Sequence, residues 1–215
     1  MTDSQRIENP EMWRKSAVMT DRWRLINGEE LYDMSADPGQ TKDVAGANVK
    51  VVEKLRAEYE SWWSSVSTRF GETCDIVVGD ERDHPTRLTS HDWHGKVVPW
   101  NQAMVKKGVA GNGSWAIDVA KAGKYEISLT RWPIELNAPI NGDGGIEGGK
   151  ALVVKKARLL AGAGEVSKDI AAGDVAVKFE VELTEGKQRL QTWFVNEGGE
   201  GVVERGAYFV YLRKL

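Results

Sequence analysis

The clearest alternation of apolar and polar residues in the chain runs over residues 175–183. The apolar positions are Val175, Val177, Phe179, Val181 and Leu183, with Ala176, Lys178, Glu180 and Glu182 between them. Successive side chains of a strand point to opposite faces, so this pattern predicts a half-buried β-strand. The turn Thr184-Glu-Gly-Lys187 then leads into a second strand over residues 189–195.

Four more strands are predicted in the same part of the chain, over residues 113–119, 124–132, 151–161 and 207–213. The distribution of glycine supports these strands, because only 4 of the 23 glycines fall in residues 1–74 and the rest lie in residues 75–215. Tight turns between short strands need glycine. Residues 75–215 are therefore predicted to form an all-β antiparallel sandwich that is jelly-roll-like.

Residues 1–74 follow another pattern. The pattern there predicts one strand over residues 16–26 and, after a turn at Asn27-Gly28, a second strand over residues 31–34. Another turn is predicted at Asp37-Pro38-Gly39. Asn48 then caps a helix that runs to Val66. Its apolar stripe consists of Val52, Leu55, Tyr59, Trp62, Trp63 and Val66. The fold class is thus α+β, a small antiparallel hairpin with one amphipathic helix followed by the sandwich.

A hairpin with a single helix makes a thin core, and we expect residues 1–74 to pack against a larger partner. The stretch Glu30-Leu31-Tyr32-Asp33, the Asp37-Pro38 pair and a helix ending in Trp62-Trp63 resemble the C-terminal region of a formylglycine-dependent sulfatase. Asp43-Val44-Ala45 stands where that family commonly has Asn-Leu-Ala. The alternative is a chance turn before a helix.

The resemblance implies that the partner is an N-terminal sulfatase catalytic domain of the bacterial arylsulfatase type, periplasmic or secreted. Such an enzyme hydrolyses sulfate esters with formylglycine and calcium, and formylglycine arises within a Cys/Ser-x-Pro-x-Arg motif. Cys74, the only cysteine, is followed by Asp75-Ile76-Val77 and does not match. We therefore expect no catalytic residue and no cofactor on this chain, which would be inactive alone. Cys74 is predicted to be inert and half-buried, with a reactive thiol as the alternative.

Two segments, residues 115–125 and 181–190, resemble strands of galactose-binding-like jelly rolls, a fold that many carbohydrate-binding modules share. The chain holds nine tryptophans, and a flat indole face can stack on the C–H face of a sugar ring. Trp115 shares a face with apolar residues and is predicted to be core. Trp132 shares parity with Glu126, Ser128 and Thr130, which favours either a sugar-stacking platform or packing at a strand edge.

Trp193 is a further carbohydrate-binding candidate, although its direction is left open by the pattern around it. Trp100 precedes Asn101 and Gln102, so that a ring stands beside two amides that can bind hydroxyl groups. The alternative for Trp100 is a loop aromatic that anchors two units. These five residues complete the predicted carbohydrate site.

Three histidines, His84, His91 and His94, lie close together in the sequence. They are weak candidates for a metal site because neutral imidazoles bind zinc, but their spacing fits no standard motif. Asn141-Gly-Asp-Gly-Gly145 lacks the spaced carboxylates of a calcium loop and is predicted to be a hairpin tip. Glu197-Gly-Gly-Glu-Gly201 is interpreted in the same way, and no metal site is predicted.

A net charge of −3 offers no basic field for nucleic acid. The chain also has no apolar run of the roughly 18 residues that could span a bilayer. The leading hypothesis is the C-terminal part of an arylsulfatase, bracing the catalytic domain or assisting the binding of a sulfated carbohydrate. Two alternatives are a free-standing carbohydrate-binding module and a structural module that mediates oligomer contacts. The sequence leaves the parent's substrate open.

Overall fold

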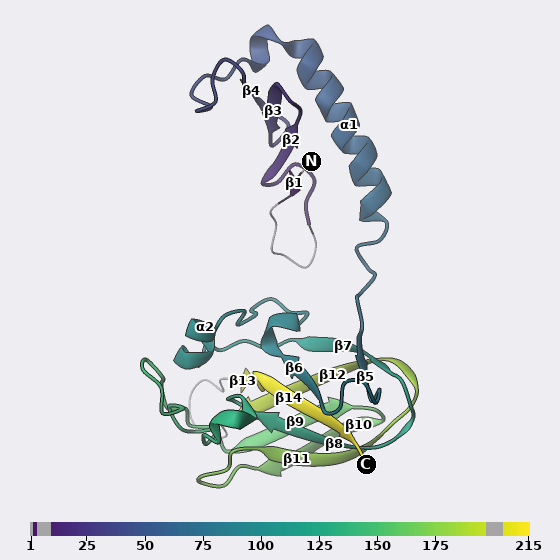
Figure 1. Ribbon diagram of the computed structural model, residues 1–215, viewed down its shortest axis with the longest axis vertical. Helices are drawn as coiled ribbons and strands as arrows, with labels where there is room; N and C mark the ends of the chain where they lie inside the picture. The colour runs from purple at the N-terminus through teal and green to yellow at the C-terminus, as the bar shows by residue number, and fades with distance from the viewer. Residues whose placement is uncertain (1, 4–9, 197–203) are drawn as a thin grey trace. The chain divides into compact units, whose positions relative to one another are not determined.

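A computed structural model describes residues 2–3, 10–196 and 204–215 of the chain (Figure 1). The chain forms two compact units, Met1–Thr73 and Cys74–Leu215. Each unit has its own hydrophobic core. None of the helices in the described part of the chain is both long and apolar enough to cross a membrane.

The first unit is an antiparallel sheet with one long helix. Its strands follow each other in the order β1-β2-β3-β4. The elements are β1 (Thr2–Asp3), β2 (Ser16–Met19), β3 (Trp23–Ile26), β4 (Glu30–Asp33), η1 (Ala45–Ala47) and α1 (Val49–Ser67). The predicted hairpin is thus part of a larger sheet.

The single strand predicted over residues 16–26 is wrong, because the chain turns back between β2 and β3. The hydroxyl Oγ1 of Thr20 accepts a hydrogen bond from the backbone N–H of Trp23 at 2.9 Å, and the Thr20 N–H donates to the Trp23 carbonyl at 2.8 Å. Such local bonds offer the backbone an alternative to an unbroken strand. The Asn27-Gly28 turn is confirmed, and both residues have positive φ.

Helix α1 begins directly after Asn48, as predicted, but the predicted side-chain cap is absent. The Asn48 side chain instead donates from Nδ2 to the carbonyl of Val44 at 2.9 Å. The predicted apolar stripe is confirmed at its centre, since Leu55, Tyr59 and Trp63 are buried. They form one core cluster with buried side chains of the sheet, namely Val18, Leu25 and Leu31.

The second unit is a sandwich of two sheets (Figure 1). One sheet has the order β10-β9-β12-β7-β5, with β13 pairing with β12, and the other has the order β11-β8-β14-β6. The first sheet contains β5 (Ile76–Val78), β7 (Ser114–Val119), β9 (Lys156–Ala161), β10 (Gly164–Asp169), β12 (Gly186–Val195) and β13 (Glu204–Arg205). The second contains β6 (Thr86–Thr89), β8 (Gly123–Thr130), β11 (Val177–Leu183) and β14 (Phe209–Lys214). The connections also hold η2 (Ser90–Asp92), α2 (Gln102–Lys107) and η3 (Ile134–Leu136).

The sandwich departs from a purely antiparallel one at a single described pair, because β5 runs parallel to β7. The strand predicted over residues 151–161 begins only at Lys156. Strand β10 was not predicted, and all six of its residues are exposed. With neither face covered, no alternation of apolar and polar positions marks such a strand.

Two glycine turns, the predicted one at Gly186 and a second at Gly123, connect the sheets rather than neighbouring strands. Gly186 opens β12 with φ +101°, and Gly123 opens β8 with φ +144°. In each case the preceding strand lies in the opposite sheet. The period-two strands on both sides of these turns therefore face each other across the core.

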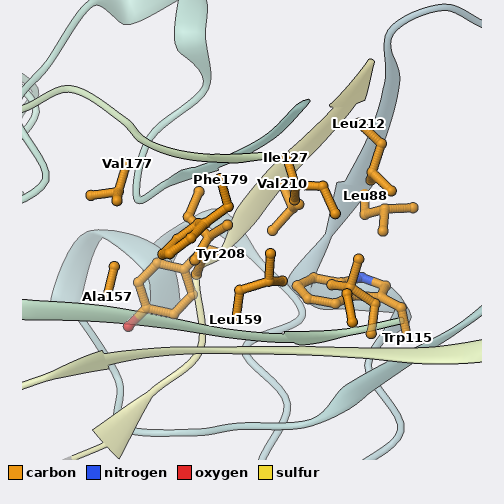
Figure 2. Close-up of a cluster of buried hydrophobic side chains, with 14 of the residues drawn as sticks. Leu88, Trp115, Ile127, Ala157, Leu159, Val177, Phe179, Tyr208, Val210 and Leu212 are labelled. Atoms are coloured by element: carbon orange, nitrogen blue, oxygen red, sulfur yellow. The ribbon is translucent and has the colours of Figure 1, made fainter. Parts of the chain in front are cut away.

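The core of the second unit lies between its two sheets. Figure 2 shows Leu88, Ile127 and Val210 of one sheet near Trp115 and Leu159 of the other. The prediction that Trp115 is core is confirmed, because its side chain is fully buried and its Nε1 donates to the Thr89 carbonyl at 2.8 Å. The prediction for Cys74 is corrected, since this thiol is exposed rather than half-buried.

Candidate functional site

A cleft of about 460 Å³ opens at the surface of the second unit. Four segments form its walls: the end of β6 with η2, the start of α2, the residues after β8 and the start of β14. In Figure 1, α2 and the long connection after β8 lie at one end of the sandwich, and the C-terminus lies toward the other. The lining is mainly apolar and includes Pro99, Trp100, Val105, Trp132, Pro133, Leu136, Ile146 and Phe209.

Helix α2 carries one wall of the cleft. Asn101 caps it, since its Oδ1 accepts a hydrogen bond from the Met104 N–H at 2.9 Å. Gly108 ends it in the left-handed conformation with φ +62°. An asparagine cap followed seven residues later by a C-terminal glycine is a helix signature that the sequence contains. The cap thus uses one lone pair of Oδ1, and the Nδ2 group and the second lone pair of Oδ1 are left for hydroxyl groups.

Trp100 gives the cleft an open aromatic ring. It lies directly before the helix cap and is 52% exposed, although it lines the cleft. Gln102, in the first turn of α2, also lines the cleft and is exposed. The structure therefore places the three predicted residues 100–102 together at one edge of the hollow.

Trp132 lines the same cleft but is buried, with 3% of its surface exposed. The Arg131 guanidinium lies 4.3 Å from its ring centroid, and a Cβ added to Gly144 would come within 3.0 Å of the ring. Its Nε1–H is buried and has no acceptor among the described residues. Packing therefore covers most of this ring, and only its edge toward the cleft can meet a ligand.

The burial of Trp132 agrees with packing at a strand edge, one of the two alternatives that the sequence left open. Ser128 and Thr130 are polar but buried, so their side of β8 is not an open polar face at this end. The Thr130 hydroxyl donates to the Trp132 carbonyl at 2.7 Å, which satisfies it without water. A polar residue that bonds its own backbone neighbour can sit on a covered face.

Arg131 holds the walls of the cleft together and was missed by sequence reasoning. It is fully buried and donates to three carbonyls: Gly142 at 2.7 Å, Lys150 at 2.6 Å and Lys106 at 3.2 Å. These carbonyls belong to α2 and to the long connection between β8 and β9. Burial lowers the pKa of the Arg131 guanidinium to about 10. The arginine is thus placed where water cannot help to stabilise its charge.

Two further side chains fix the chain that follows α2. Arg205 donates from Nε to the Gly108 carbonyl at 2.8 Å, and the Tyr208 hydroxyl donates to the Val109 carbonyl at 2.8 Å. Burial raises the pKa of Tyr208 to about 12. The two carbonyls directly after the helix are therefore satisfied by side chains from distant parts of the sequence.

The remaining candidate tryptophan lies elsewhere. Trp193 belongs to β12, in the sheet opposite the one whose strands wall the cleft, and it is not among the lining residues. The Arg158 guanidinium lies 4.7 Å from its ring centroid. The structure therefore separates Trp193 from Trp100 and Trp132, with which the sequence grouped it.

The described residues contain no group of three or more His, Cys, Asp or Glu side chains that could hold a metal ion. His91 lines the cleft, and its Nδ1 lies 4.0 Å from Asp92. His84 and His94 are exposed and lie outside the lining. The structure thus does not bring the three histidines together as ligands.

The segment predicted as a hairpin tip at residues 141–145 is instead part of the long connection between β8 and β9. Asn141 is bonded there to the backbone of Val154. The second glycine-rich segment, residues 197–201, lies outside the described residues.

A second hollow of about 510 Å³ lies along the sheet that contains β8 and β14. Its lining is polar and its charges are matched. Glu126 accepts contacts from Lys178 at 3.4 Å and from Arg213 at 3.2 Å. Salt bridges thus already neutralise the centre of this surface.

No family model matches the chain, and no curated protein matches it. Among solved structures, a ruminal GH26 endo-β-1,4-mannanase is similar with a TM-score of 0.36 and 12% identity, over 64% of this chain and 27% of that one. A carbohydrate-binding module of Cellvibrio mixtus lichenase 5A, solved with cellotriose, has a TM-score of 0.31 and 10% identity, over 61% and 98%. A CBM35 module from Cellvibrio japonicus has a TM-score of 0.30 and 11% identity, over 65% and 86%.

These neighbours are too distant to assign a function to the chain, which spans about a quarter of the mannanase. Two of the three are carbohydrate-binding modules, and no sulfatase is among them. No family model and no curated protein links residues 12–70 to sulfatases, so the sulfatase resemblance stays a prediction.

Proposed function

We propose that the second unit binds a carbohydrate in the cleft beside Trp100. The observation that carries this proposal is a largely exposed indole at the edge of a mainly apolar hollow. The exposed indole adjoins the apolar lining of the cleft, and a contiguous apolar surface of this kind marks binding sites. A sugar ring, apolar on its C–H face and polar at its edge, matches that surface.

The polar groups around the ring support the same ligand class. Gln102 and the Nδ2 group of Asn101 supply amide donors and an acceptor at the open edge of the cleft. The volume of about 460 Å³ falls within the range of roughly 300–1,000 Å³ that small-molecule sites occupy. The cleft thus combines one stacking surface with a few hydrogen-bonding groups.

Rigidity also supports the proposal. Arg131 bonds three carbonyls of the walls, and the Asn101 side chain caps α2. A preformed cleft loses little conformational entropy when a ligand binds, which favours affinity. A function of this kind fits a free-standing binding module, and it fits equally a module that assists substrate binding in a larger enzyme.

The test is affinity for soluble polysaccharides, measured by calorimetric titration of the full chain and of two matched variants. We expect Trp100→Ala to weaken binding at least tenfold, or about 1.4 kcal/mol. Trp193→Ala removes the same side chain from the opposite sheet and is expected to change affinity less than twofold. If binding is absent across neutral and acidic polysaccharides, or if both variants bind like the wild type, the proposal is wrong.

The first unit has no ligand assigned to it. The finer hypothesis, that residues 1–74 brace a sulfatase catalytic domain, would place this chain beside an enzyme that hydrolyses sulfate esters. Assay of the full chain with a chromogenic sulfate ester is expected to show no turnover. Sulfate release by the chain alone would contradict that hypothesis, because none of the family's nucleophile motif is present in it.

A further inference from the structure

We infer that the cleft selects a saccharide that carries a negative charge, either a sulfate ester or a carboxylate. The inference rests on the proposed function, since it names the class of sugar that the same cleft would take. It is drawn from the charges that line and underlie the cleft.

The formal charge of the lining is positive. Lys106 carries it, and the lining contains no aspartate or glutamate. Lys106 forms no ion pair with any residue that the structure describes. Asp92, the acidic neighbour of His91, lies outside the lining and accepts a hydrogen bond from the Thr89 hydroxyl at 2.9 Å.

A buried cation lies directly behind the cleft. The Arg131 guanidinium is fully buried, lies 4.3 Å from the ring of Trp132, and bonds only to carbonyl oxygens. Within the described residues, no carboxylate comes within 4.0 Å of it, and Asp143 acts on it only at longer range. A charge held in a region of low dielectric is weakly screened, so its field reaches the cleft.

In the second hollow of the same unit, by contrast, salt bridges pair the central charges. There, the Glu126 carboxylate meets both Lys178 and Arg213. The cleft has no such partner for Lys106 or Arg131 in the part of the chain that the structure describes. A sulfate or carboxylate group on the ligand would supply the missing negative charge.

Helix α2 offers a structural reason for a lysine at this position, and also a matched control. Lys106 and Lys107 both lie in its last turn, where positive charge favours the negative end of the helix dipole. Only Lys106 lines the cleft. Replacing either lysine removes the same charge from the helix end, but only Lys106→Gln removes it from the cleft.

The experiment compares galactan, mannan and glucan, each unmodified, sulfated and oxidised to the carboxylate at C6. Affinity electrophoresis or calorimetry of the full chain is expected to show preferential binding of the charged forms, weakened by added salt. We expect Lys106→Gln to weaken binding of a charged form about fivefold, the factor for a partly exposed ion pair. Lys107→Gln is expected to bind like the wild type.

The outcomes separate the two proposals. Equal affinity for charged and unmodified forms, with no effect of Lys106→Gln, overturns this inference and leaves carbohydrate binding intact. No binding to any of the polysaccharides overturns both. Preference for only the sulfated or only the oxidised form supports the inference and identifies which anionic group the cleft takes.

Discussion

Asn141 and Val154 exchange two hydrogen bonds although they lie 13 residues apart. The Asn141 Nδ2 donates to the Val154 carbonyl at 2.9 Å, and its Oδ1 accepts from the Val154 N–H at 2.8 Å. The Asn141 side chain thus bonds both backbone polar groups of Val154, as a neighbouring strand would, and Val154 is almost fully buried. This pair ties together the long connection that contributes Ile146 to the cleft.

We therefore expect Asn141→Ala to destabilise the second unit by about 2–4 kcal/mol, because two buried backbone groups lose their partners. Urea denaturation measures the change. Ser167→Ala, at an exposed position on β10, is the control and is expected to stay within about 0.5 kcal/mol of the wild type. An Asn141→Ala variant as stable as the control would show that the connection is held by other contacts.

Substitutions of Trp115 test the packing at the centre of the sandwich. Its ring is fully buried and packs edge-on against Trp93 with centroids 5.5 Å apart. We expect Trp115→Phe to cost about 1–3 kcal/mol, since the Thr89 carbonyl loses its donor and some volume is lost. Trp115→Ala should cost about 3–5 kcal/mol. Denaturant titration that found both variants equal to the wild type would contradict the described core.

The raised pKa of Tyr208 predicts that the second unit loses stability at alkaline pH. Its folded-state pKa is raised to about 12 from an ordinary value of 10, chiefly by burial. A raised folded-state pKa means that the folded state keeps its proton when the unfolded chain loses it. The stabilisation from this group is therefore complete below pH 10 and is lost as the pH rises from 10 to 12.

The measurement compares the wild type with Tyr208→Phe between pH 8 and pH 11.5. The phenylalanine variant is expected to be about 1 kcal/mol less stable at pH 8, because the Val109 carbonyl loses its donor. The advantage of the wild type should fall by about 2 kcal/mol over the range, so that the phenylalanine variant becomes the more stable protein by about 1 kcal/mol at pH 11.5. A gap that stayed constant with pH would mean that Tyr208 ionises as it does in the unfolded chain.

A substitution of Gly28 tests the packing of the first unit. It has φ +75°, and a Cβ on it would lie 2.9 Å from the ring of Trp13. That ring in turn stacks on Tyr59 with centroids 4.0 Å apart. We expect Gly28→Ala to destabilise this unit by about 1–3 kcal/mol and to speed hydrogen exchange in β3 and β4. Gly46→Ala, where nothing lies within 4 Å of the added carbon, is the control.

The sequence predicted those elements whose signals are local. The alternation around Phe179, the stripe through Leu55 and Tyr59, and the Asn27-Gly28 turn all appear in the structure. Strand β10 was missed, because exposure on both faces leaves no alternation of apolar and polar residues. The turn between β2 and β3 was missed because it depends on a hydrogen bond from the backbone of Trp23 to the Thr20 hydroxyl.

The cleft was predictable only in part. Trp100 and Gln102 were found because a ring beside amides is visible in the sequence. Trp132 was also a candidate, with packing at a strand edge as the alternative. The role of Arg131 was not predicted, since burial at the end of a strand depends on a connection that returns from residues 142–150. Phe209 and Ile146 join the cleft from distant parts of the chain, and no local pattern marks them.

The central claim is that a carbohydrate binds beside Trp100, and indole N–H resonances test it most directly. The nine tryptophans give nine separate probes in one heteronuclear NMR spectrum. During titration with a polysaccharide fragment, the account predicts shifts of the Trp100 and Trp132 signals, with Trp193 and the first unit's Trp23 unchanged. Saturating shifts at Trp193 or Trp23 with Trp100 unmoved would contradict it.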